Sequence, residues 1–138
     1  MRLATIIFVT MCTLSYAEDT KPFTVDMSTQ IMGPEGKPFL ECAESEIVDD
    51  RPTGKCLRVT PRTLGRISYG LLNSPDKSLN VADQAKQGAL ALKLLTADAP
   101  VELGIADRKR ILDLLAKAGE PMVLVTRVHE LLAPGEVK

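Results

Sequence analysis

Residues 56–73 read CLRVTPRTLGRISYGLLN, and within this stretch the sequence changes from a strand pattern to a helix pattern. Residues 56–59 alternate apolar and polar side chains, as a half-buried strand does. Apolar residues then recur at helical spacing, at Leu64, Ile67 and Leu71. Either Thr60-Pro61 or Thr63 can begin this helix, because threonine caps and proline is tolerated in the first turn. The sequence therefore predicts an α+β, mainly α fold, with β structure in residues 18–60 and helices in residues 61–133.

The β region is rich in proline, glycine and aspartate, and short alternating runs at residues 23–27, 39–42 and 56–59 predict strands. The run 39–42 ends at Cys42 and the run 56–59 begins at Cys56, and these two runs can pair as an antiparallel hairpin. With Cys42 opposite Cys56, Glu41 faces Leu57, Leu40 faces Arg58 and Phe39 faces Val59. A disulfide would then staple this hairpin, with the acidic residues 44–50 as its loop.

The cysteine count supports a disulfide. Of three cysteines, Cys12 lies in an apolar N-terminal run, which leaves Cys42 and Cys56 as an even pair. A bond that closes a loop of about 15 residues contributes roughly 3 kcal/mol by the chain-entropy model. A metal site would need more ligands, and the only histidine, His129, is far along the chain. Clustered acids between the cysteines could bind calcium, but their spacing follows no EF-hand register, so a solvated loop is expected.

Four helices are expected after residue 60. The second runs from Val81 to Ala97, with Val81, Ala85, Ala89 and Leu92 on one side and Gly88, Ala91 and Leu95 on the next. Its small residues, Gly88 above all, suggest that another helix crosses there closely. The third begins near Ile105 and stops at Gly119. The fourth has Pro121 in its first turn, although residues 122–126 also fit a strand. Residues 134–138 form a tail.

The N-terminal segment has the order of a secretory signal peptide. Arg2 precedes an uncharged run from Leu3 to Leu14, and small residues at Ser15 and Ala17 fit a signal peptidase. Cleavage is expected between Ala17 and Glu18. The apolar run is too short for a retained membrane anchor, which needs roughly 20 residues. A lipoprotein signal at Cys12 is disfavoured because Met11, not a small residue, precedes it.

Cleavage of residues 1–17 leaves 121 of the 138 residues, enough for one core, and changes the formal charge from −1 to −2. This charge and the absence of tryptophan argue against a nucleic-acid partner. The densest basic cluster, Arg108-Lys109-Arg110, is flanked by acids and is expected to be a solvated helix face.

No catalytic, phosphate-binding, cofactor or metal motif occurs in the sequence. His129 is the one side chain that titrates near neutral pH, and a surface position near a helix C-terminus is expected for it. A small enzyme that uses His129 with Asp107 or Glu102 is an alternative, which the fold would have to assemble.

Short motifs are spread over residues 23–133: Asp26-x-Ser28, Gly33-x-x-Gly36-Lys37-Pro38, Thr63-Leu64-Gly65, Ala89-Leu90-Ala91-Leu92-Lys93 and Val101-Glu102-Leu103, before an Asp107-led and a Pro121-led helix. In this order the chain resembles small uncharacterised phage and prophage proteins. The resemblance implies a helical interaction module and brings no functional residues with it. Residues 40–57 look like an insertion, and those phage proteins carry no export signal.

We therefore expect a small exported protein, periplasmic or secreted, that needs no cofactor and binds another protein or helps one assemble. No stable membrane insertion is expected after cleavage. A second hypothesis is a phage-derived structural or assembly protein whose N-terminus is retained and packs on a partner. The sequence leaves the partner and the oligomeric state open, because wide helix stripes of small residues do not separate a dimerisation patch from core.

Overall fold

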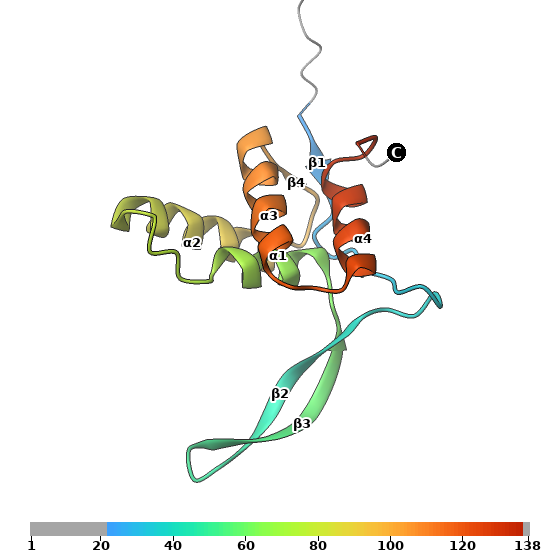
Figure 1. Ribbon diagram of the computed structural model, residues 1–138, viewed down its shortest axis with the longest axis vertical. Coiled ribbons are helices and arrows are strands. Elements are labelled where there is room, and N and C mark those ends of the chain that lie inside the picture. Colours follow the sequence, from blue (N-terminus) through green and yellow to red (C-terminus); the bar gives the residue numbers. More distant parts are fainter. Residues whose placement is uncertain (1–21, 137–138) are drawn as a thin grey trace, which may run out of the picture.

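The computed structural model describes residues 22–136, which form a helical body and a long hairpin that projects from it (Figure 1). In chain order the elements are β1 (Thr24–Val25), β2 (Leu40–Val48), β3 (Arg51–Pro61), α1 (Leu64–Leu72), α2 (Val81–Leu95), β4 (Val101–Glu102), α3 (Ile105–Lys117) and α4 (Met122–Leu132). β1 pairs antiparallel with β4, and β2 pairs antiparallel with β3. The predicted α+β, mainly α class with four helices is confirmed. Residues 122–126 are helical.

The change from strand to helix occurs at Thr63, the second of the two expected caps. Thr60 and Pro61 are the last residues of β3. Thr63 has an extended backbone, and its hydroxyl oxygen accepts a hydrogen bond from the Arg66 N–H at 3.3 Å. This bond satisfies one of the free donors at the start of α1.

The other helix ends also follow local sequence. The Asn80 side chain caps α2 by accepting from the Asp83 N–H at 2.8 Å. Gly119 follows α3 with a φ of +70°, the left-handed conformation expected of a glycine stop. Pro121 stands immediately before α4, close to its expected place in the first turn.

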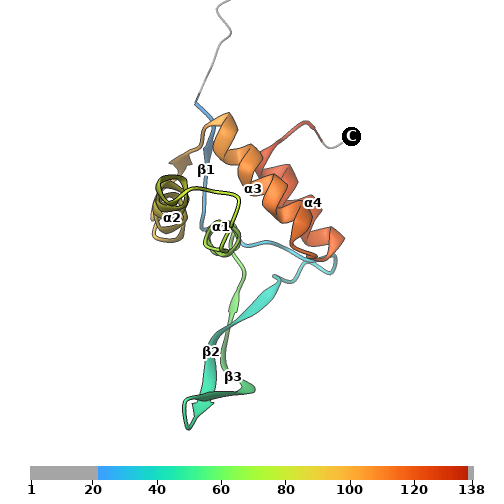
Figure 2. The same ribbon diagram turned by 60° about the vertical axis from the view of Figure 1, so that its left-hand side comes forward.

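Buried apolar side chains from all four helices and from the β1 and β4 segments form one core. Its members are Val25, Met27, Ile31, Leu64, Ile67, Leu71, Leu72, Ala91, Leu94, Val101, Leu103, Ile111, Leu115, Leu124, Val128 and Leu132. Within residues 22–136, neither β2 nor β3 contributes a residue to this core. Figure 2 shows the hairpin pointing away from the helices.

The glycine that allows close packing is Gly65 in α1, not Gly88 as expected from the sequence. A Cβ at position 65 would lie 2.7 Å from the carbonyl oxygen of Leu94 in α2 and 3.1 Å from that of Met27. A Cβ at position 88 would meet nothing within 4 Å. The backbones of α1 and α2 therefore approach each other at Gly65, where no side chain fits.

The apolar stripe expected on α2 is partly wrong. In α2 the core receives Ala91 and Leu94, whereas the stripe that begins at Val81 faces away from it. In α4 the buried stripe is Leu124, Val128 and Leu132, and Met122 is exposed. Both helices carry apolar residues around more than half of their circumference, so periodicity alone does not select the inner face.

Candidate interaction surfaces

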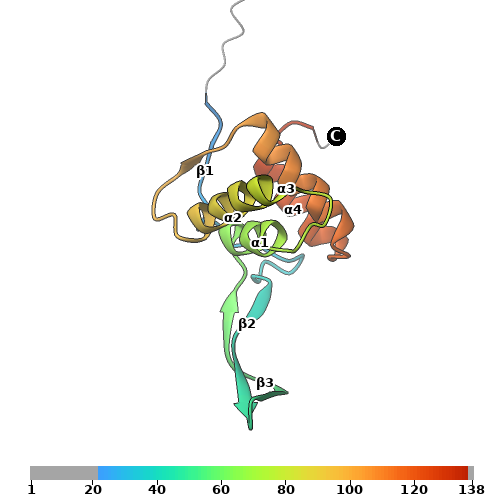
Figure 3. The same ribbon diagram turned by 90° about the vertical axis from the view of Figure 1, so that its left-hand side faces the viewer.

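The β2–β3 hairpin is an arm whose contacts are mainly between its own two strands. Five of its large apolar side chains are more than half exposed: Leu40, Ile47, Val48, Leu57 and Val59. Figure 3 shows that no helix covers the arm when the molecule is viewed from its α2 side. A two-stranded ribbon without a packing partner is marginally stable in water, so this arm needs other restraints.

The Cys42–Cys56 disulfide is the first restraint, and the predicted pairing of these cysteines is confirmed, with Cα atoms 5.7 Å apart. The expected register is wrong. Cys42 pairs with Val59 and Cys56 with Ser45, so the bond crosses the ribbon diagonally. The turn pairs Val48 with Arg51, and the register shift between Ser45 and Ile47 then moves the pairing further from the expected one, whereas the two shifts beside Glu44 cancel. Such bulges leave no mark on the alternation of apolar and polar residues that suggested the simpler register.

The tip of the arm is a two-residue turn made by Asp49 and Asp50. Val48 pairs with Arg51, and the two aspartates have φ values of +51° and +59°. Positive φ at both central residues matches the right-handed twist of a hairpin, and aspartate adopts it more readily than most residues. The strands thus continue to Val48 and from Arg51, where the sequence suggested an acidic loop.

Two ion pairs cross the middle of the ribbon. A Glu46 carboxylate oxygen lies 3.5 Å from Lys55 Nζ, and a Glu44 carboxylate oxygen lies 3.8 Å from Arg58 Nε. These exposed pairs add little stability each, but they neutralise the middle of the arm. Within residues 22–136, the turn residues Asp49 and Asp50 and the adjacent Arg51 form no ion pair, so the tip keeps a net charge of −1.

An ion-pair cluster holds the base of the arm on the helical body. Arg62, which follows β3, donates two hydrogen bonds to Glu120 in the α3–α4 connection, at 2.9 and 2.8 Å. Glu41 in β2 bonds Arg66 in α1 and lies 3.9 Å from Arg62. The hydrogen bonds from Arg62 lower the pKa of Glu120, and those to Glu120 raise the pKa of Arg62. Three elements therefore meet at one partly buried cluster, which sequence reasoning missed because its members are up to 79 residues apart along the chain (Glu41 and Glu120).

A second exposed apolar surface lies on the outer face of α2. We define it by Val81, Ala82, Ala85, Ala89 and Leu92, all of which are exposed. Val81 is 82% and Leu92 56% exposed. A surface helix normally turns charged residues to solvent, so this outer face is a candidate interaction surface.

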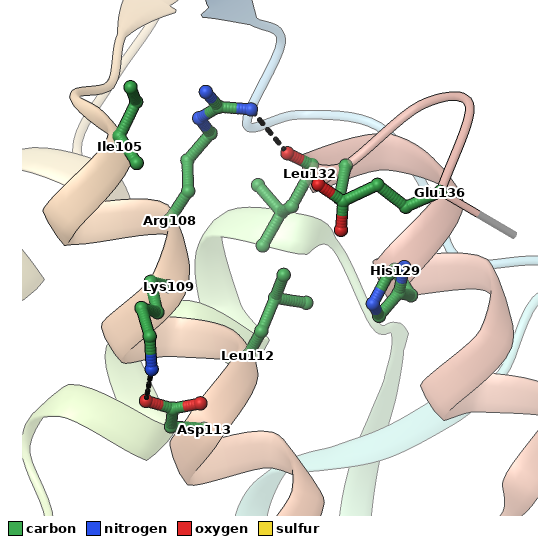
Figure 4. Close-up of a pocket in the computed structure, with 9 residues that line it drawn as sticks. Ile105, Arg108, Lys109, Leu112, Asp113, His129, Leu132 and Glu136 are labelled. Atoms are coloured by element: carbon green, nitrogen blue, oxygen red, sulfur yellow. Dashed lines mark hydrogen bonds and ion pairs between the residues drawn. The ribbon is translucent and has the colours of Figure 1, made fainter.

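His129 lies in a cavity of about 380 Å³ between α3 and α4, where its ring points toward Leu112 (Figure 4). Its Nδ1 is buried and, within the described residues, has no hydrogen-bond partner. Neither Glu102 nor Asp107, the acids considered as its partners, lines this cavity; Asp113 and Glu136 do. Asp113 accepts a hydrogen bond from Lys109 at 2.8 Å, which lowers the pKa of that carboxyl.

The cavity offers little for covalent chemistry. No serine, threonine, cysteine or tyrosine is among the described residues that line it. In the part of the chain that the structure describes, no group of three or more His, Cys, Asp and Glu side chains is placed to hold a metal ion. The structure therefore does not bring Glu102 or Asp107, the two acids of the His129 hypothesis, into this cavity.

The basic cluster 108–110 is only partly the solvated face that the sequence suggested. Lys109 is exposed, but Arg108 lies over the Phe23 ring, 4.1 Å from its centroid, and donates to the Leu132 carbonyl. Arg110 donates to Asp76 in the α1–α2 loop.

The pKa of Asp76 is lowered to about 2 by the hydrogen bond from Ser78 and then by that from Arg110. Arg108 and Arg110 thus tie α3 to α4 and to the α1–α2 loop. Their charges are used inside the fold rather than offered to a phosphate.

Comparison of the chain with family models, curated proteins and solved structures gives no match. The predicted cleavage site between Ala17 and Glu18 and the apolar run before it lie outside the described residues. In residues 22–136, no helix is both long and apolar enough to cross a membrane. Function is therefore argued from the exposed arm and the outer face of α2.

Proposed function

We propose that this chain is an exported protein-binding module and that the β2–β3 hairpin is its binding arm. The observation that carries the proposal is the exposure of five large apolar side chains on an element that has no role in the core. Full burial of such a side chain contributes about 1.5–3 kcal/mol, so a partner that covers several of them gains substantial binding energy.

The restraints on the arm support the same function. A disulfide, a two-residue turn and the cluster around Arg62 hold the hairpin in one conformation without a partner. A preorganised surface loses less conformational entropy on binding than a flexible one, which favours affinity. None of these restraints is needed to complete the core.

Export is the second part of the proposal. A disulfide persists in an oxidising compartment such as the periplasm or the extracellular space. Intact mass of the full-length product, expressed with its native N-terminus in a Gram-negative host, tests this. We expect a species that begins at Glu18 and is lighter than its reduced form by two hydrogen atoms. An uncleaved, reduced chain would contradict export and favour the intracellular alternative.

Photo-crosslinking tests the binding arm, and the chain offers a matched pair of positions. Ile47 on the arm is 66% exposed, and Ile105 at the start of α3 is 77% exposed. A photoreactive phenylalanine analogue at position 47 should yield a discrete protein adduct in the cells that produce the chain. The same analogue at position 105 should not. Equal adducts from both positions, or none from position 47, would refute the arm as the binding element.

A further inference from the structure

We infer that the partner of the arm is a second copy of this chain, and that the tip of the hairpin docks on the outer face of α2 of that copy. The inference rests on the proposed function, because it identifies the partner of the same arm. Two exposed apolar surfaces carry it, and their charges are opposite in sign.

The outer face of α2 is apolar with a basic border. At 100° per residue, Lys86 and Lys93 lie on the same flank of the helix, next to Ala82 and Ala89. Lys93 forms no ion pair with any residue in 22–136, and Lys86 reaches Asp83 only at 3.8 Å. An antiparallel pairing of two α2 helices about a twofold axis would bring these lysines together. A second α2 is therefore a poor occupant of this face, and an apolar element with acidic groups is a good one.

The tip of the hairpin has that chemistry. Ile47 and Val48 are 66% and 53% exposed, and the aspartates at 49 and 50 follow them directly. The ion pairs of Glu46 with Lys55 and of Glu44 with Arg58 lie further down the arm. At the tip, Asp49, Asp50 and the adjacent Arg51 form no ion pair within residues 22–136, so the tip has a net charge of −1. Placing the tip on α2 covers apolar side chains on both surfaces and sets the aspartates beside the two lysines.

The dimensions allow the contact. Nine residues of β2 span about 30 Å at 3.3 Å each, and fifteen residues of α2 span about 22 Å at 1.5 Å each. The arm projects from the body and is long enough to lie across this helix of a neighbour (Figure 1). If each copy donates its arm to the other, the association closes as a symmetric pair.

A charge-swap experiment tests the inference by light scattering coupled to size-exclusion chromatography. The chain beginning at Glu18 should associate, and Asp49→Lys/Asp50→Lys and Lys86→Glu/Lys93→Glu should each raise the dissociation constant by about 100-fold. An equimolar mixture of the two variants should associate again, because the lysine tip of one then meets the glutamate face of the other. Recovery in the mixture is expected only if the tip of one copy contacts α2 of the other. A contact of tip with tip, or of α2 with α2, would not be restored by mixing.

Two controls accompany the swap. Glu35→Lys/Glu102→Lys makes the same change in net charge as the tip variant, at exposed positions that belong to neither surface, and should leave association unchanged. Because lysine is disfavoured at positive φ, Asp49→Asn/Asp50→Asn removes the charge with residues that tolerate that backbone, and it should weaken association by about tenfold.

The inference is overturned if the unaltered chain is monomeric, or if the charge variants associate as it does. The proposed function fails separately, through the crosslinking at position 47. A monomeric chain that still crosslinks there to a different protein would leave the binding arm standing and remove the second copy as its partner.

Discussion

Removal of the disulfide by Cys42→Ser/Cys56→Ser should unfold the arm and leave the helical body intact. The bond closes a loop of about 15 residues, for which the chain-entropy model gives roughly 3 kcal/mol. The arm has no core contacts, and a lone hairpin is marginally stable, so this loss is comparable with its whole local stability. In the body, the same change removes nothing from the buried cluster.

Amide hydrogen exchange measures the two parts separately. At 1.36 kcal/mol for each factor of ten, a loss of 3 kcal/mol corresponds to amide exchange about 100-fold faster in β2 and β3. Exchange in α1–α4 should be unchanged, and the free energy of unfolding of the body in urea should change by less than about 0.5 kcal/mol. The reciprocal control is Leu124→Ala. Truncation of this fully buried side chain should lower the free energy of unfolding of the body by about 2–5 kcal/mol, while the disulfide keeps the arm closed.

Two results would refute this reasoning. If the double serine variant lowered the unfolding free energy of the helices as much as it loosened the arm, the hairpin would be part of the cooperative unit. If exchange in β2 and β3 did not change, the ion pairs, the turn and the base cluster would suffice to hold the arm without the bond.

The remaining predictions concern packing and pH. Gly65→Ala should lower the free energy of unfolding in urea because its Cβ would meet backbone, whereas Gly88→Ala, with open space around it, should raise this free energy by up to about 1 kcal/mol. If Gly65→Ala lowered the free energy of unfolding by less than substitutions at exposed helix positions do, α1 and α2 would not be in close contact at Gly65. Glu120→Gln should cost about 2 kcal/mol at neutral pH by removing charged hydrogen bonds from Arg62. Because the folded pKa of Glu120 is lowered, its contribution is present above the unfolded pKa of about 4.5 and is lost as pH falls below it. Urea unfolding between pH 7 and pH 3 should therefore converge for the two proteins; a constant difference would exclude this linkage.

Helix ends could be predicted from the sequence because they depend on neighbouring residues. Thr63, Gly119 and Pro121 act on backbone groups within one turn of themselves, so their roles follow from residue type and position. The disulfide was predictable for a related reason. Once Cys12 in the apolar run is excluded, only Cys42 and Cys56 remain, and two cysteines can form only one intramolecular disulfide.

The register of the hairpin and the inner face of α2 could not be predicted. The bulge between Ser45 and Ile47 offsets the strands without changing the alternation of residue types. In α2, apolar residues occupy both faces, and only the packing of distant segments against Ala91 and Leu94 shows which face is buried. The cluster of Arg62, Glu120 and Glu41 joins distant segments, and no local pattern reports it.

The sequence by itself determined the class of fold, the approximate positions of the helices and the identity of the disulfide, since these depend on local propensity and on counting. Only the tertiary structure decided which apolar residues are core and which are surface. Burial is a property of the assembled body, because a side chain is covered only when a distant segment packs on it. In this chain, the tertiary packing leaves the hairpin tip and the outer face of α2 exposed.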